Sequence, residues 1–278
     1  FKLKSRRLNL SPWNNYRSKA GKCKKTVKIA MIGKYVDLAD SYKSLNEALY
    51  HAGIINDRLV EIIYLDSEQI TKANVKKLKV MDGILVPGGF GNRGIEGKIL
   101  AAQYARVNKI PYLGICLGMQ ISVIEFARNV LKLKNANSTE FNSKTKHPVV
   151  ALVDEWKDNS GKKIISDKKN MGGTMRLGSQ DCTLSKGSLA YKMYEKLAIN
   201  ERHRHRYEVN GSLLELFNDS GLKFSGKSKK GNLMEMIELK GHPWYLGCQF
   251  HPEFTSSPIS GHPLFNGFIA ASKKKRKL

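Results

Sequence analysis

Strand-like and helix-like patterns alternate along the first half of the chain. Short hydrophobic runs that end at glycine or proline predict strands, and hydrophobic residues spaced three or four apart predict helices. The expected strands span residues 27–33, 59–65, 83–87 and 111–115, and the expected helices span residues 40–53, 67–79, 94–109 and 117–132. This alternation predicts a parallel sheet that is covered by helices on both faces.

The pattern changes after residue 147. The lysine-rich segment 157–173 contains few hydrophobic residues, so we expect a mobile loop there. Around it, short hydrophobic segments separated by polar turns predict further strands, and the last hydrophobic segment predicts a closing helix. These strands are expected at residues 149–153, 174–184, 204–210, 221–226, 233–239 and 244–250, and the helix at residues 259–272.

The expected α/β domain covers residues 27–272 and is flanked by two basic ends. Residues 1–26 are polar and aperiodic, which predicts a linker or arm, and residues 273–278 form a basic tail. The first 28 residues carry ten Lys and Arg and no acid, and the tail carries five more, so the ends supply 15 of the 24 net positive charges. Because aromatic residues are not interleaved with these basic runs, we expect no nucleic-acid binding.

Hydropathy and cysteine spacing argue against several other classes of protein. No hydrophobic run approaches the roughly 18 residues of a membrane span, and the N-terminal segment lacks the hydrophobic core of a signal peptide. We therefore expect a cytoplasmic protein that makes no membrane contact. The cysteines at 23, 116, 182 and 248 are far apart in the sequence. This spacing provides neither a zinc-ligand pair nor a redox CxxC motif, so we expect reduced thiols and no metal site.

One cysteine lies between a predicted strand and a predicted helix. The segment "GICLGMQ" (114–120) places Cys116 between Gly114 and Gly118. This spacing fits the G-x-S-x-G elbow with sulfur in place of oxygen. The helix N-terminus that follows favours the thiolate form. Cys116 is therefore a candidate nucleophile, and the alternative is a small buried structural cysteine.

A candidate base follows the last predicted strand, in the segment "CQFHPEF" (248–254). Pro252 favours an extended conformation at His251, and side chains two apart in an extended segment point the same way. Glu253 is then able to orient the imidazole while the other ring nitrogen faces Cys116. The alternative is a strand-end turn that contains a histidine without a catalytic role.

The glycine-rich segment "VPGGFG" (86–91) follows another predicted strand. Such a loop exposes backbone N–H groups, which together with the N–H of Leu117 would form an oxyanion hole. The alternatives are a phosphate-binding turn and a simple tight bend. The segment is not a Walker A motif, because no GK[ST] follows it.

In this order, the glycine loop, the elbow and the H-P-E segment resemble those of class I glutamine amidotransferases. The segments "KIAMIGKYVDLADSYKSLNEALYHAG", "MGGTMRLG" and "ERHRHRYEVN" are similar to the glutaminase domain of CTP synthases, and the resemblance spans residues 28–258. It implies a flavodoxin-like fold with a mostly parallel central sheet, helices on both faces and additional antiparallel strands. It also implies a site at the carboxyl ends of the strands.

The resemblance implies roles for particular residues. Cys116 would attack the side-chain amide of L-glutamine, His251 would move the proton with Glu253 positioning it, and the backbone N–H groups of Gly89 and Leu117 would hold the oxyanion. Since glutamine is a zwitterion, we expect a carboxylate to hold its α-ammonium group and an arginine its α-carboxylate. The implied glutamine-binding residues are Gly89, Leu117, Gly118, Met119, Gln120, Glu140 for the ammonium and Arg206 for the carboxylate, and the implied GTP-responsive residues are Arg93 and Arg176.

The resemblance also implies partners beyond this domain. Full-length members carry a synthetase domain that uses ATP with magnesium to convert UTP to CTP, respond to GTP as an activator, and assemble as homo-oligomers, expected to be tetramers. This sequence contains no P-loop, so we expect the chain itself to be a glutaminase with no cofactor of its own. Two alternatives stay open: a GTP-sensing or filament-forming regulatory module that is inactive in isolation, and a related γ-glutamyl cysteine hydrolase.

Overall fold

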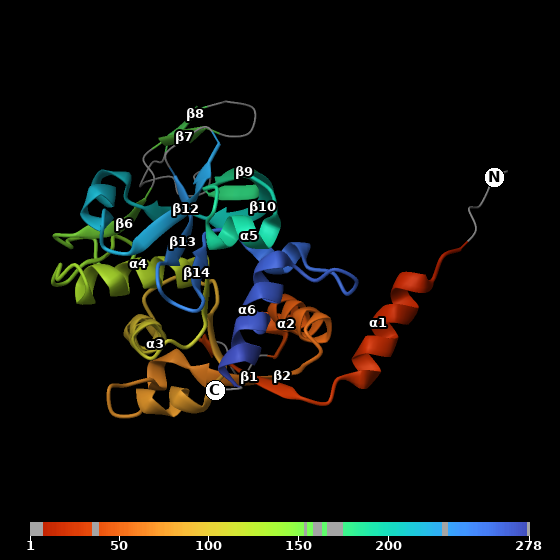
Figure 1. Cartoon of the computed structure of the whole chain (residues 1–278). Coiled ribbons are helices and arrows are strands. Elements are labelled where there is room, and N and C mark those ends of the chain that lie inside the picture. The colour runs from red at the N-terminus through yellow and green to blue at the C-terminus, as the bar shows by residue number, and fades with distance from the viewer. Residues whose placement is uncertain are drawn as a thin grey trace.

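The computed structural model describes residues 8–34, 39–152, 155–157, 163–165, 175–229 and 233–276. Its centre is a nine-stranded mixed sheet with the strand order β10-β9-β12-β13-β14-β4-β3-β1-β2 (Figure 1). Five neighbouring strands are parallel: β1 (Thr26–Gly33), β2 (Leu59–Asp66), β3 (Gly83–Val86), β4 (Tyr112–Ile115) and β14 (Tyr245–Cys248). Antiparallel pairing extends the sheet beyond β14 through β13 (Met234–Leu239), β12 (Leu222–Ser228), β9 (Arg176–Leu184) and β10 (Ala198–His205).

Helices cover both faces of this sheet, as the sequence predicts. One face carries α3 and α4, and the other carries α2 and α6 (Figure 1). Strand β1 shows why: Ala30 and Ile32 belong to the core beneath α3 and α4, whereas Val27, Ile29 and Met31 belong to the core beneath α2 and α6. A strand buried on both faces reads as a continuous hydrophobic run. The helix bounds are α2 (Lys43–Ile55), α3 (Ile95–Val107), α4 (Leu117–Asn129) and α6 (Pro263–Lys275).

A second, three-stranded sheet packs against α4. It has the order β11-β6-β5, formed by β5 (Asn137–Ser138), β6 (Pro148–Leu152) and β11 (Tyr207–Val209). The single predicted strand at 204–210 is therefore wrong. The chain leaves the large sheet with β10, turns at Arg206 and enters the small sheet with β11.

Several elements differ from the sequence-based expectation. The expected arm contains a helix, α1 (Ser11–Lys22), which buries none of its residues and stands to one side of the body (Figure 1). The expected helix at 67–79 is two short 3₁₀ segments, and α5 (Leu189–Tyr194) was not predicted. The expected loop at 157–173 includes part of a hairpin of β7 (Glu155–Lys157) and β8 (Lys163–Ile165), and the rest of it lies outside the described residues.

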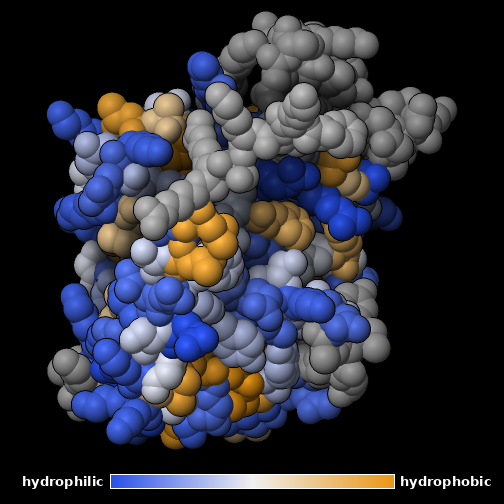
Figure 2. Space-filling view, turned by 90° about the vertical axis from the view of Figure 1, so that its right-hand side faces the viewer, coloured by the Kyte–Doolittle hydropathy of each residue, from blue (hydrophilic) through white to orange (hydrophobic). Residues whose placement is uncertain are grey.

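The described start of the basic tail is attached to the body. Helix α6 runs to Lys275, whose Nζ donates to the carbonyl oxygen of Met81 at 2.7 Å. Arg276 donates to the carboxylate of Asp82 at 2.9 Å. Hydrophilic side chains cover most of the face in Figure 2, with hydrophobic ones in separate small groups. Among the described residues, no helix has both the length and the hydrophobicity that a membrane crossing requires.

The exposed position of α1 predicts that it contributes little to stability. Deleting residues 1–22 is expected to change the melting temperature by less than about 3 °C, because α1 buries no side chain in the core. Thermal unfolding followed by circular dichroism measures this. Deleting residues 1–33 is the contrasting variant: it also removes β1, which pairs with β2 and β3, and it is expected to abolish folding. A loss of more than about 8 °C in the shorter deletion would contradict the prediction.

Candidate active site

Cys116 occupies the turn between β4 and α4. Its backbone has φ 51° and ψ −106°, a conformation that is strained for a non-glycine residue. A Cβ added at Gly114 would lie 2.5 Å from the carbonyl oxygen of Gly118, and one added at Gly118 would collide with the carbonyl oxygen of Val86. Only glycine therefore fits at positions 114 and 118. The expected elbow is therefore present.

His251 and Glu253 follow the end of β14 and meet this cysteine. The imidazole Nδ1 lies 2.7 Å from Oε1 of Glu253, and the ring is close enough to Cys116 for that residue to raise the pKa of the imidazole. The backbone N–H of His251 donates to the carbonyl oxygen of Arg202 at 2.8 Å. The structure thus brings together the three expected catalytic residues, with the carboxylate on one side of the ring and the sulfur on the other.

The charges around His251 favour its protonated form. Burial acts to lower the pKa of the imidazole, but the negative charges of Cys116 and Glu253 and their hydrogen bonds outweigh it and raise the pKa to about 10. Near neutral pH the ring is therefore an imidazolium. An imidazolium beside a cysteine is the arrangement that activates sulfur nucleophiles.

The other three cysteines lie in a different environment. All four cysteines are free thiols. Burial raises the pKa of Cys23, Cys182 and Cys248, and nearby carboxylates raise it further. These three thiols are therefore held in the neutral form at physiological pH.

The glycine loop after β3 lies against the catalytic pair. A Cβ added at Gly88 would lie 2.8 Å from Cε1 of His251. Hydrogen bonds hold this loop in place: Nζ of Lys34 donates to the carbonyl oxygens of Phe90 at 2.5 Å and Gly91 at 3.1 Å. From the other side, Oε1 of Glu140 accepts the backbone N–H of Gly91 at 2.7 Å. Lys34 and Glu140 therefore hold the loop close to Cys116.

A cavity of about 410 Å³ opens above these groups. Its lining includes the glycine loop, the segment that enters α2, and the side chains of Cys116, His251 and Arg204. A cavity of this size accommodates a small amino acid. Its described lining consists of Asp40, Ser41, Tyr42, Lys43, Ser44, Leu45, Pro87, Gly88, Gly89, Phe90, Cys116, Arg204, His251, Glu253 and Phe254.

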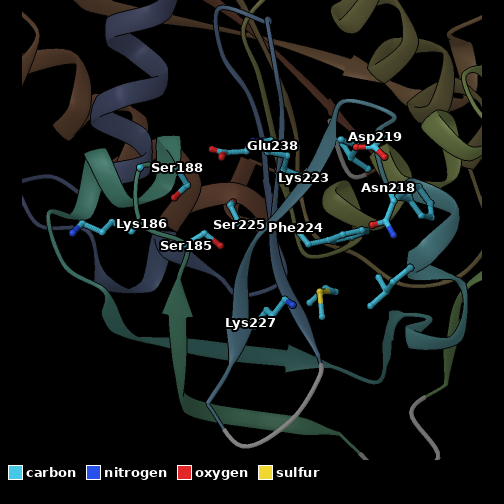
Figure 3. Close-up of a pocket in the computed structure, with 15 residues that line it drawn as sticks. Ser185, Lys186, Ser188, Asn218, Asp219, Lys223, Phe224, Ser225, Lys227 and Glu238 are labelled. Atoms are coloured by element: carbon cyan, nitrogen blue, oxygen red, sulfur yellow. The ribbon is translucent and has the colours of Figure 1, made fainter.

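A second cavity, of about 510 Å³, lies along β12 (Figure 3). Ser185 and Ser188 lie on one side of the strand in this view, and Asn218 and Asp219 on the other. Among the described lining residues there is neither a cysteine nor a histidine. None of the residues predicted from the sequence lines it. The nucleophilic chemistry therefore belongs to the first cavity.

Most of the predicted glutamine ligands lie beside the first cavity rather than in its wall. Gly89 lines it, but the other six are not among its described lining residues: Leu117, Gly118, Met119, Gln120, Glu140 and Arg206. Gly118 packs against β3, and Met119 is fully buried. The side-chain amide of Gln120 donates to the carbonyl oxygen of Tyr207 at 2.8 Å and to Oε1 of Gln249 at 3.3 Å.

Glu140 and Arg206 are close enough to influence each other. Burial raises the pKa of the Glu140 carboxyl, and the backbone of Gly91 together with the charges of Lys34, Arg206 and Lys98 counteracts this. The expected contacts of Glu140 and Arg206 with the glutamine ammonium and carboxylate, and the expected oxyanion roles of the Gly89 and Leu117 amides, stay predictions.

The two arginines expected to respond to GTP have opposite environments. The Arg93 side chain is half exposed and ion-pairs with Glu68 at 3.4 Å, so phosphate can still reach it. The prediction for Arg176 is wrong in this structure. Its side chain is 3% exposed and is bound by the carboxylates of Glu208 and Glu235, so these two buried residues already compensate its charge.

His203 and His205 belong to the same buried group as Arg176. Nδ1 of His203 lies 2.8 Å from Nε2 of His205. Burial and the charge of Arg176 hold the pKa of both imidazoles well below the usual value, so both rings are neutral. Among the described residues, no group of three or more His, Cys, Asp or Glu side chains is placed to hold a metal ion.

Three residues of the site were not found from the sequence. Lys34 directly follows β1. A lysine at the carboxyl end of a buried strand is a sequence signal that would have indicated a site residue. Arg204 lies in the "RHRHR" segment, where nothing local distinguishes it from Arg206. Gln249 precedes the H-P-E segment and places Nε2 3.8 Å from Sγ of Cys116. Their contacts are made with residues far away in the sequence, which is why local patterns do not reveal them.

The electrostatic origin of the His251 pKa can be tested by NMR. Glu253→Gln and Cys116→Ala each remove one stabilising charge, so each is expected to lower the His251 pKa from about 10. In the double variant only burial remains, and the pKa is expected to fall below the ordinary value of about 6.5. Titration of ¹³Cε1-labelled histidine measures this. His242, whose pKa burial lowers to about 4, is the internal control, and an unchanged His251 pKa would contradict the assignment.

Comparison with known proteins agrees with this geometry. The family model described as "Glutamine amidotransferase class-I" matches residues 37–271. The structure of the glutaminase domain of Trypanosoma brucei CTP synthase with bound acivicin is 40% identical, with a TM-score of 0.80 over 89% of this chain and 94% of that chain. Two other amidotransferase structures align: one from Methylobacillus flagellatus (11% identity, TM-score 0.48, 82% of this chain and 70% of that one) and one from Thermotoga maritima (12%, 0.49, 90% and 97%).

The family model covers most of the chain, including the elbow, the glycine loop and the His251–Glu253 pair. The similarity to the trypanosomal domain extends over nearly the full length of both chains. Sequence, fold and site therefore agree, and the chain belongs to the class I glutamine amidotransferase family.

Proposed function

We propose that this chain is the glutaminase domain of a CTP synthase and hydrolyses L-glutamine to glutamate and ammonia. The observation that carries the proposal is the Cys116–His251–Glu253 arrangement in the lining of a cavity large enough for an amino acid. The 40% identity to the trypanosomal glutaminase domain, which binds the glutamine analogue acivicin, supports the choice of substrate.

The first half of the reaction transfers the γ-glutamyl group to sulfur. The thiolate of Cys116 attacks the side-chain amide carbon of glutamine, and the carbonyl oxygen becomes an oxyanion that backbone N–H groups of Gly89 and Leu117 stabilise. The imidazolium of His251 gives its proton to the amide nitrogen. The carbon–nitrogen bond then breaks, ammonia leaves, and a thioester and a neutral imidazole remain.

The second half regenerates the enzyme. Neutral His251 takes a proton from a water molecule, whose oxygen attacks the thioester carbonyl. The tetrahedral species collapses, the carbon–sulfur bond breaks, and the thiolate leaves beside the re-formed imidazolium. The new γ-carboxylic acid loses its proton, so the products are glutamate and ammonia or ammonium. Glu253 holds the ring in one orientation throughout.

The wider setting is also part of the proposal. Ammonia would pass to a synthetase domain that converts UTP to CTP with ATP and magnesium, in a homo-oligomer of the full-length protein. GTP would act as the activator, with Arg93 as its expected contact in this domain. The half-exposed guanidinium of Arg93 supports that contact. The free thiols support a cytoplasmic location.

Removing the nucleophile tests the proposed reaction. Wild-type protein is expected to release ammonia from L-glutamine and to be labelled by acivicin at Cys116, whereas Cys116→Ala is expected to lose both. Cys23→Ser, at the periphery of the core, is the matched control and is expected to keep both. Ammonia is measured by a coupled glutamate dehydrogenase assay and labelling by mass spectrometry of the peptides. Ammonia release by Cys116→Ala, or hydrolysis of γ-glutamyl peptides but not of glutamine, would contradict the proposal.

The support of the glycine loop by Lys34 gives a second test. Lys34→Met removes the charged hydrogen bonds to Phe90 and Gly91, so the loop amides lose their fixed orientation. We expect kcat for glutamine hydrolysis to fall about 10- to 100-fold, the range for loss of a charged hydrogen bond. Lys28→Met, within β1 and in an exposed pair with Glu61, is the control and should keep its activity. Equal activity of both variants would show that the loop does not depend on Lys34.

A further inference from the structure

Behind the sulfur of Cys116 lies a buried side-chain amide that the proposed reaction does not yet use. Gln249 directly follows β14 and is fully buried. Its Nε2 lies 3.8 Å from Sγ of Cys116. Its backbone N–H donates to the carbonyl oxygen of Glu235 at 2.8 Å, which fixes the main chain at this position. The sulfur therefore lies beside the Gln249 amide and the His251 ring, and the carbonyl oxygen of Arg204 lies 4.0 Å from it as an acceptor for the protonated thiol.

The hydrogen-bond network determines which end of the Gln249 amide faces the sulfur. The Gln120 NH₂ group donates to the carbonyl oxygen of Tyr207 and to Oε1 of Gln249. A backbone carbonyl oxygen can only accept a hydrogen bond, so the Gln120 group that contacts the Tyr207 carbonyl is its NH₂. The same NH₂ group contacts the side-chain amide of Gln249. Gln249 must then present its oxygen to Gln120, which leaves its NH₂ pointing to Cys116. In the reverse orientation, the NH₂ groups of Gln120 and Gln249 would face each other and the Gln249 oxygen would face the Cys116 thiolate. Both contacts would be repulsive.

We propose that Gln249 is a catalytic residue that donates an N–H hydrogen bond to the Cys116 thiolate, and that Gln120 is the positioning residue that orients it. The proposal rests on the proposed glutaminase reaction for its role in turnover, but not for the contact itself. It assigns to Gln120 a role other than the glutamine contact that the family resemblance implies.

A hydrogen bond from an amide to a thiolate is stronger than one to a neutral sulfur. In the thioester the sulfur carries no charge, so the interaction weakens when the acyl group arrives and strengthens again when the thiolate leaves. Gln249 therefore stabilises the resting thiolate and the departing sulfur in thioester hydrolysis. The groups of other elements that face Cys116 are the charged His251 and Glu253 after β14, Arg204 of β10 and the thiol of Cys248. Gln249 adds a donor without adding a charge.

The contact is tested without substrate by alkylation of Cys116. Gln249→Met has nearly the same volume and no donor, and Gln249→Asn keeps an amide that is one methylene too short to reach the sulfur. The rate at which iodoacetamide alkylates Cys116 is measured against pH by mass spectrometry of the Cys116 peptide. Both Gln249 variants are expected to shift the acidic side of this rate–pH profile to higher pH by about one unit, which is a tenfold lower alkylation rate at a given acidic pH. The plateau at high pH is expected to remain. Gln180→Met, which removes a buried glutamine from β9, is the control.

Steady-state and burst kinetics with glutamine test the role in turnover. Both Gln249 variants are expected to lower kcat about tenfold with KM unchanged or lower, and to accumulate the γ-glutamyl thioester. Gln120→Met is expected to reproduce the alkylation shift in weaker form. An alkylation profile that coincides with wild type would overturn the proposal even if stability drops. A raised KM with unchanged kcat would show that these glutamines bind substrate instead. Absence of ammonia release from wild type together with a shifted profile would overturn the glutaminase proposal and leave the contact standing.

Discussion

The parallel pairing of β4 with β14 aligns Ile115 with Cys248, and the backbone N–H of Cys116 donates to the carbonyl oxygen of Cys248 at 2.7 Å. This register brings the nucleophile and its proton carrier together although they are 135 residues apart in the sequence. Because side chains alternate along a strand, a slip by one residue would exchange the faces of the residues at the end of β14. The elbow, the Gln249 amide and the imidazolium all depend on this one alignment.

Holding the nucleophile in this position has an energetic cost. A non-glycine residue in such a strained conformation is destabilised by about 1–3 kcal/mol. The carbonyl oxygen of Cys116 accepts from the backbone N–H groups of Met119 and Gln120, and its own N–H is paired with β14. Cys116 is also 3% exposed, so its surroundings determine its conformation. The strain serves the reaction, because it places Cys116 in the lining of the cavity and at the N-terminus of α4.

The parts of the structure that were predicted correctly are those with a local cause. Continuous hydrophobic runs identify β1, β3 and β4, and glycines around Cys116 identify the elbow. Strand β10 shows the limit, because its inward-facing residues include Glu201, His203 and His205. Such a strand has no hydrophobic period, and its buried polar side chains lie among polar groups from other elements. His203 and His205 lie beside Glu235 of β13 and Glu208 of β11, which both bind Arg176 of β9. Glu201 binds His262, which is 61 residues away in the sequence. The same cause explains the prediction for Arg176. From the sequence alone its charge is expected to be free to bind a phosphate, because Glu208 and Glu235, which bind it, are distant in the sequence.

The two donors to sulfur, His251 and Gln249, have different relations to the reaction. The imidazolium must give its proton to the leaving nitrogen, so its positive charge is absent while the thioester exists. An amide N–H does not titrate, and the donor at Gln249 is therefore present in every state of the cycle. A fixed neutral donor avoids the excessive stabilisation of the thiolate that a second positive charge would bring, which would reduce the nucleophilicity of the sulfur. One mobile proton and one fixed donor thus meet both demands of the reaction: a sulfur reactive enough to attack and stable enough to leave.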